Sequence, residues 1–170
     1  MYHFFKTLWG NLLLSKGPQD FACSSVLLWL CLLASVVTGV PALLSKVGFA
    51  YAVLAAVVDV LVLLLFVYLG LQAFSKLARF VQSATALVSV SVVFQMIAFL
   101  LLAPLETAQA QDQANGMAGL ALLFLSWYLA VCTHIFRQVF GVQLPVAMIL
   151  TICYIVINRL AVGIFMPELL

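Results

Sequence analysis

The stretch that decides the fold is Val60-Leu61-Val62-Leu63-Leu64-Leu65-Phe66, seven consecutive apolar residues within a longer apolar run, 47–71. A run of this length suits a membrane-spanning helix, which needs roughly 17–25 residues. A strand of a membrane barrel would alternate apolar and polar residues, and this stretch does not. Because lipid leaves backbone groups unpaired unless the protein pairs them, only helices and closed barrels span it. The stretch therefore predicts a transmembrane helix.

Further apolar stretches of similar length lie on both sides of this one. We place the spans at about 22–44, 47–71, 84–104, 117–139 and 142–165. Only 7% of the residues are charged, against about 25% in a soluble domain. The sequence thus predicts an all-α, polytopic membrane helical bundle, with residues 18–170 as a single domain of five transmembrane helices. This composition excludes a cytosolic enzyme and a disordered chain, and a net charge of +2 is too small for nucleic-acid binding.

Residues 1–17 form a separate segment. Its apolar residues recur at helical spacing, and they are Phe5, Leu8, Trp9, Leu12 and Leu13. Polar residues occupy the rest of the turn: Lys6, Asn11 and Lys16. This pattern predicts a short amphipathic helix lying in the membrane interface, ended by Gly17-Pro18. A cleaved signal peptide is the alternative, and the polar break before the first long apolar run disfavours it.

The basic residues predict the orientation of the chain. One side of the expected bundle receives Lys6, Lys16, Lys76, Arg79 and Arg137, and the other receives Lys46 and Arg159. Basic residues concentrate on the cytoplasmic side of membrane proteins, so we expect a cytoplasmic N-terminus and a C-terminus outside. The inner-face basic patch, defined as Lys76, Arg79 and Arg137, either orients the chain or docks partners.

Asp59 lies at the centre of the second span, where an acidic residue costs about 2.5–3.5 kcal/mol on insertion scales. A ridge of small residues, Gly48, Ala52 and Ala56, runs along the same helix at four-residue spacing. Such ridges let helices approach closely, and Asp59 falls on or beside this one. We therefore expect Asp59 to point into the bundle. The ridge could serve internal packing or contact with a second copy of the chain.

Other spans also carry polar residues at helical spacing. If these faces turn inward, the polar residues meet near the middle of the membrane. We call this group the polar seam and define it as Asp59, Gln95, Tyr154 and Asn158. In one interpretation Asp59 is a proton or cation site, with its polar neighbours as supporting ligands. In the other it is a hydrogen-bonded anchor that keeps helices in register. A single buried acid, with no Gly- or Pro-broken helix at mid-depth, favours the anchor.

No motif for catalysis or metal binding stands out. The four cysteines fall inside predicted spans, and none has the spacing of a zinc or redox site. There is no Gly-x-Ser-x-Gly elbow, His-Glu-x-x-His pair or phosphate loop. We therefore expect no catalytic residue, no metal and no cofactor.

The middle and end of the chain resemble the Yip family of five-span membrane proteins. The similarity rests on a long apolar helix, a short basic turn and a helix ending at proline, which here are Leu63–Leu71, Phe74–Gln82 and Pro104-Leu105. Ser126-Trp127-Tyr128-Leu129, with Arg137 and Gly141 before the last span, fits the same layout. The aspartate- and glycine-rich signature of eukaryotic members is absent. The resemblance implies a bacterial inner-membrane protein without catalytic activity that organises partners.

The leading hypothesis is therefore a Yip-like scaffold or assembly protein, contacting membrane lipids and other membrane proteins. The alternative is a transporter or channel subunit that uses the polar seam around Asp59. A membrane-embedded enzyme of lipid metabolism comes third, because no motif supports it.

Overall fold

The described chain folds into helices and turns. This computed structural model describes residues 2–14, 17–21, 23–102 and 113–165, and within those ranges it contains no strand. The α-helices are α1 (Tyr2–Leu12), α2 (Ser25–Val47), α3 (Phe49–Ala73), α4 (Phe80–Leu102), α5 (Gln113–Phe140) and α6 (Leu144–Phe165). Two short 3-10 helices, η1 (Pro18–Asp20) and η2 (Leu77–Arg79), precede α2 and α4. The predicted all-α class is confirmed.

Four stretches of helix are long and apolar enough to cross a membrane. They are Phe49–Ala73, Leu77–Leu100, Gly119–Phe140 and Leu144–Phe165. The apolar stretch of α2, Ser25–Pro41, is shorter. By length and composition the chain is a membrane protein, and the count of five spans stays a prediction. Some helices begin before the predicted spans: α4 starts at Phe80, because polar residues such as Gln82 join the helical backbone ahead of the apolar run.

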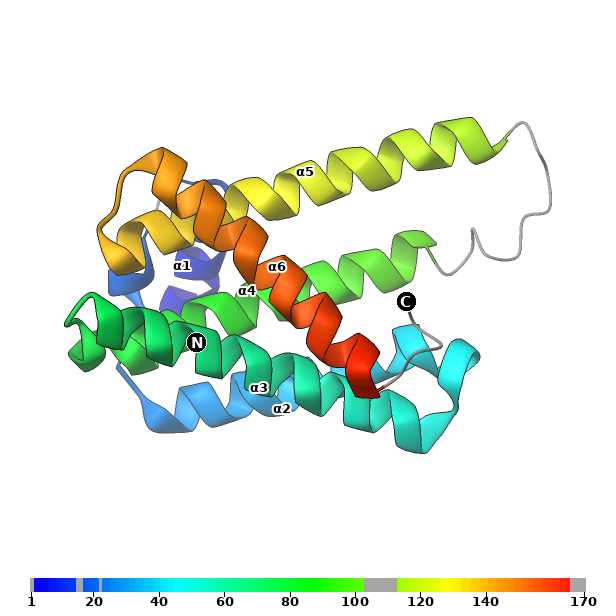
Figure 1. The fold of residues 1–170 in the computed structure, drawn as a ribbon, viewed down its shortest axis with the longest axis horizontal. Helices are drawn as coiled ribbons and strands as arrows, with labels where there is room; N and C mark the ends of the chain where they lie inside the picture. The colour runs from blue at the N-terminus through cyan, green and yellow to red at the C-terminus, as the bar shows by residue number, and fades with distance from the viewer. Residues whose placement is uncertain (1, 15–16, 22, 103–112, 166–170) are drawn as a thin grey trace.

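The long helices alternate in direction, and α6 crosses the others obliquely (Figure 1). Gly48 alone joins α2 to α3, and its φ of +77° lies in the left-handed region that favours glycine. At the opposite end of the bundle, α3 and α5 finish and α4 and α6 begin (Figure 1). We call this the basic end, because Lys76, Arg79 and Arg137 lie in those connections and the last turn of α5. Lys16, expected on the same side, lies outside the described residues.

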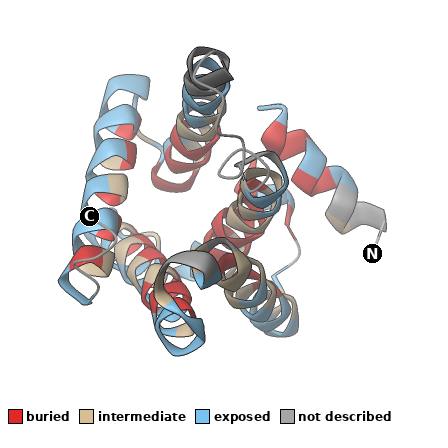
Figure 2. Cartoon of the chain, turned by 90° about the vertical axis from the view of Figure 1, so that its right-hand side faces the viewer, coloured by how far each residue is buried: buried red, intermediate tan, exposed pale blue. Residues whose placement is uncertain are grey.

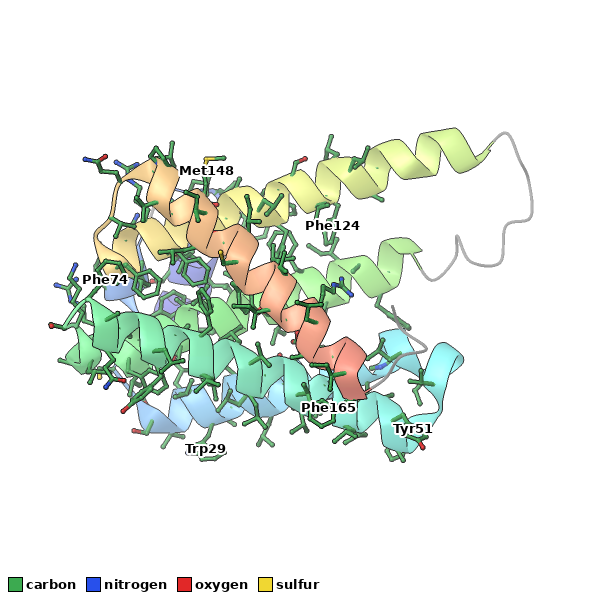
Figure 3. The ribbon with its side chains drawn as sticks, viewed as in Figure 1. Trp29, Tyr51, Phe74, Phe124, Met148 and Phe165 are labelled. Atoms are coloured by element: carbon green, nitrogen blue, oxygen red, sulfur yellow. The ribbon has the colours of Figure 1, made fainter. Side chains whose placement is uncertain are left out.

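Buried residues turn toward the middle of the bundle (Figure 2), and many of the exposed residues carry large apolar side chains. Every residue from Ser83 to Val90 of α4 is buried, and several of them are small or carry hydroxyls. Trp29, Tyr51 and Met148, by contrast, are exposed on the outer surface (Figure 3). Lipid tails are as apolar as leucine, so membrane helices bury small and polar residues instead.

The N-terminal helix α1 runs across the bundle rather than along it (Figure 2). It packs on α4 and α5, and the indole of Trp127 donates a 3.3 Å hydrogen bond from Nε1 to the carbonyl of Leu12. Asn11 is fully buried, with its amide Nδ2 donating to the carbonyl of Thr7 at 3.1 Å.

The segment predicted as a short interfacial helix is helical, and its apolar residues lie on two faces. Trp9 and Leu13 are exposed, while Leu8 and Leu12 are buried together with the polar Asn11. The face of α1 that packs on α4 and α5 therefore carries both apolar and polar residues, and the Oδ1 of Asn11 has no hydrogen-bond partner among the described residues. The helix also ends before Gly17: Leu14 takes the left-handed φ of 59°. The Phe5 side chain lies outside the described part of the chain.

Candidate functional site

Asp59 of α3 contacts α6 through Asn158. The amide Nδ2 of Asn158 donates a 2.7 Å hydrogen bond to Oδ1 of Asp59 and a 3.2 Å hydrogen bond to the hydroxyl of Tyr154. Asn158 and Tyr154 are buried, and Asp59 is half-buried. These residues form a polar cluster, Asp59–Asn158–Tyr154, between two helices.

The oblique path of α6 explains how one helix reaches two neighbours. Near its start, the hydroxyl of Thr133 on α5 donates to that of Thr151 at 3.2 Å. Two turns later, Asn158 meets Asp59 of α3. Thr151, Tyr154 and Asn158 repeat at three- and four-residue steps, which places them on one helix face, and all are buried. The expected inward stripe of this helix is therefore present.

Gln95 lies apart from this cluster. Its Oε1 accepts a 2.7 Å hydrogen bond from the hydroxyl of Thr38 on α2. Next to Thr38, Gly39 lies so close to α3 and α4 that a Cβ there would meet Ala56 at 3.4 Å and Gln95 at 3.6 Å. The expected partnership of Gln95 with Asp59 is thus replaced by one with α2. We did not single out Thr38, although Ser35, Thr38 and Gly39 share a face of small residues that could have indicated close packing.

Aromatic rings surround Tyr154 on the side toward the basic end. Its ring centroid lies 5.5 Å from that of Phe66 and 5.9 Å from that of Phe136. Its hydroxyl also interacts with Tyr128, which in turn interacts with Cys132. The cluster therefore continues from Asp59 along α6 into α5, with apolar rings on its flank.

The chemistry that this cluster can perform depends on the groups that surround the Asp59 carboxylate. Asn158, a neutral amide, is the hydrogen-bond partner of Asp59 within the described residues, and Arg159, the next residue of α6, acts on the carboxylate through its positive charge. The second carboxylate oxygen of Asp59 is not a buried atom that lacks a hydrogen-bond partner. A carboxylate placed in this way can take up a proton or bind a small cation, or it can act only as a hydrogen-bonded anchor.

The small-residue ridge is used within the chain. Ala52 and Ala56 are buried at 0% and 5% exposure, and α3 packs closely against α2. Gly48 is exposed, with nothing within 4 Å of a Cβ placed there. A second copy of the chain could therefore reach the Gly48 end of the ridge without repacking the rest.

Of the three residues of the inner-face basic patch, one makes a hydrogen bond within the protein and two are exposed at the surface. The ammonium Nζ of Lys76 donates a 2.6 Å hydrogen bond to the carbonyl of Phe140, the last residue of α5. A cation is favourable at that point because helix C-termini carry partial negative charge. Arg79 and Arg137 are exposed at the same end of the bundle. Lys76 therefore has a structural role, and the two arginines are the residues open to lipid headgroups or partners.

Within the described ranges, no group of three or more His, Cys, Asp or Glu side chains is placed to hold a metal ion. No known protein family, curated protein or solved structure matches this chain. The fold and the apolar helices define its class, an all-α protein with helices that can cross a membrane.

Proposed function

We propose that the chain is a non-catalytic membrane scaffold or assembly protein of the Yip-like type, placed in a bacterial inner membrane with its N-terminus in the cytoplasm. One observation carries this proposal: polar side chains within the spans pair with one another across helices. Asp59 pairs with Asn158, and Thr38 pairs with Gln95. These pairs hold the helices in register, and the surface left for partners is the apolar outside of the bundle.

The outer surface supports a role in lateral contacts. Each long helix exposes large apolar side chains, among them Leu33 on α2, Leu61 on α3, Leu123 on α5 and Ile149 on α6. In a membrane these side chains meet either lipid or another protein. A scaffold needs one of these faces to contact a partner specifically.

Photo-crosslinking in native membranes tests this proposal. A photoreactive residue replaces, one at a time, each of the four exposed residues just named, and Leu87, which is 3% exposed, serves as the buried control. We expect discrete crosslinked products from one helix or from two neighbouring helices. Products of equal yield from all four positions, or none beyond those of Leu87, would contradict a scaffold. Asp59→Asn should leave the pattern unchanged.

The geometry of Asp59 supports a second candidate, a transporter or channel subunit. The hydrogen bond to Asp59 comes from a neutral amide, and a carboxylate that is not directly bonded to a cation can take up a proton or bind a cation; the nearby charge of Arg159 opposes both. Proteoliposomes with a pH-sensitive dye inside test it directly. Under an imposed potential, transport by this site predicts proton flux that Asp59→Asn abolishes and Asp59→Glu partly retains, while both variants stay folded. Equal flux in wild type and Asp59→Asn would reject this candidate.

A further inference from the structure

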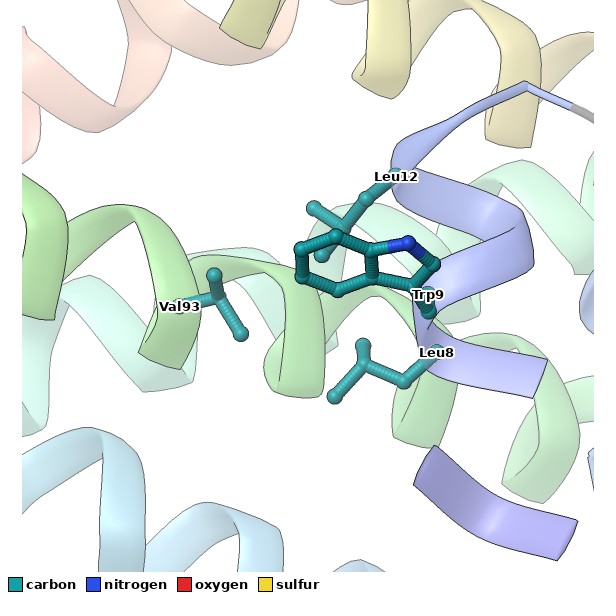
Figure 4. A pocket seen from close by; sticks show the side chains of 4 residues that line it. All are labelled: Leu8, Trp9, Leu12 and Val93. Carbon is teal, nitrogen blue, oxygen red and sulfur yellow. The ribbon is translucent and has the colours of Figure 1, made fainter. Parts of the chain in front are cut away.

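An apolar hollow lies between α1 and α4. Its volume is about 400 Å³, and its lining residues are Leu8, Trp9 and Leu12 from α1 and Val93 from α4 (Figure 4). This volume falls in the range of roughly 300–1,000 Å³ that small-molecule sites occupy. The side chains that form it carry no charge, so an apolar occupant is required.

The depth of the hollow indicates what surrounds it. Val93 lies 13 residues after Phe80, the first residue of α4, which is about 20 Å along a helix that rises 1.5 Å per residue. That position is inside a candidate membrane span, Leu77–Leu100, about 10 Å from its Leu100 end on the same rise. Trp9 is nevertheless 66% exposed. The hollow therefore opens toward lipid hydrocarbon and not toward water.

A positive charge lies on the side of the hollow nearer the basic end. Lys6 is exposed and precedes Trp9 by three residues, so both lie on one face of α1. The N-terminal part of α1 lies beside η1, because the Phe4 and Phe21 rings are 5.6 Å apart. The carbonyl of Phe21 accepts a 3.1 Å hydrogen bond from Gln82, in the first turn of α4. The charge is thus at the membrane edge and the hollow is deeper.

We propose that this hollow holds one acyl chain of an anionic phospholipid, with the phosphate of the headgroup held by Lys6. The arrangement matches both parts of such a lipid. The ammonium of Lys6 near the membrane surface matches the phosphate, and the apolar hollow below it matches the acyl chain. The indole of Trp9 then covers the chain from the lipid side. This inference rests on the membrane location and not on the scaffold role, since lipid contact needs no protein partner.

Quenching of tryptophan fluorescence by brominated lipids tests the proposal in vesicles that contain only this protein. Trp9 and Trp29 are both 66% exposed, so Trp29 on α2 is a matched reference for ordinary lipid contact. The difference between wild type and Trp9→Phe, or Trp29→Phe, isolates each signal. We expect brominated phosphatidylglycerol to be preferred over brominated phosphatidylcholine about fivefold at Trp9, the preference that one lysine near the surface provides, and not at Trp29.

Two variants separate the headgroup from the chain. Lys6→Gln should reduce the preference at Trp9 to the value at Trp29. Val93→Phe, which fills the hollow, should lower quenching at Trp9 by both lipids, while Val146→Phe, on the exposed face of α6, should not. Equal lipid preference at Trp9 and Trp29 in the wild type would overturn the proposal. A preference that survives Lys6→Gln would overturn it as well, and neither result depends on the fold of the Val93 variant.

Discussion

The hydrogen bond between Asn158 and Asp59 predicts a measurable coupling between α6 and α3. Asn158→Leu keeps the branched shape and the number of heavy side-chain atoms of asparagine and removes the donor that lies 2.7 Å from Asp59 and 3.2 Å from the Tyr154 hydroxyl. Polar contacts between membrane helices are worth about 0.6 kcal/mol on average and about 1.7 kcal/mol at most. With two bonds lost, we expect the free energy of unfolding to fall by about 1–2 kcal/mol.

The double variant Asp59→Leu, Asn158→Leu makes the expectation sharper. Removal of Asn158 alone leaves a carboxylate without its donor, whereas removal of both residues also eliminates the cost of an acid at mid-span, about 2.5–3.5 kcal/mol on insertion scales. A polar pair replaced by apolar residues of similar volume is often neutral or stabilising. We therefore expect the double variant to be at least as stable as Asn158→Leu, with a coupling energy of about 0.6–1.7 kcal/mol.

Unfolding by SDS in mixed micelles, followed by circular dichroism, measures these free energies. Ser126→Ala is the control, because the exposed Ser126 hydroxyl donates to the carbonyl of Leu122 on its own helix at 2.7 Å. Combined with Asp59→Leu, it should be additive within about 0.3–0.5 kcal/mol. If the Asp59–Asn158 coupling is no larger than this control value, the hydrogen bond does not join the two helices and the anchor role is refuted.

Two more variants test the basic end of the bundle by the same unfolding titration. Lys76→Met removes the ammonium that lies 2.6 Å from the carbonyl of Phe140 and should lower the free energy of unfolding by about 1 kcal/mol. Arg79 is exposed, and Arg79→Met should lower it by less than about 0.5 kcal/mol. Equal losses in the two variants would contradict a stabilising contact between Lys76 and the end of α5. Gly70→Ala places a Cβ 2.6 Å from the Phe140 ring and should cost about 1–3 kcal/mol. Gly119→Ala, with nothing within 4 Å of its Cβ, should not destabilise, and a similar loss at both glycines would refute the close packing.

The sequence predicts depth along each helix better than it predicts partners between helices. Asp59, Tyr154 and Asn158 fall at compatible depths and on inward faces, and the structure joins them. Gln95 has a suitable depth as well, but its partner is Thr38. The choice depends on which helix lies beside α4, and hydrophobic periodicity carries no information about neighbours. Close packing at Gly39 decides it.

The contacts of α1 could not be predicted from its amphipathic pattern. That pattern groups Leu8, Trp9, Leu12 and Leu13 apart from Asn11 and says nothing about which residues meet protein. In hydrocarbon an exposed indole costs little, and Trp9 is 66% exposed. Asn11 is at 0% exposure, where its Nδ2 donates to Thr7 of its own helix and its Oδ1 has no partner among the described residues. The face that meets protein combines Leu8, Asn11 and Leu12, so neither the polar nor the apolar residues of this helix identify that face by themselves.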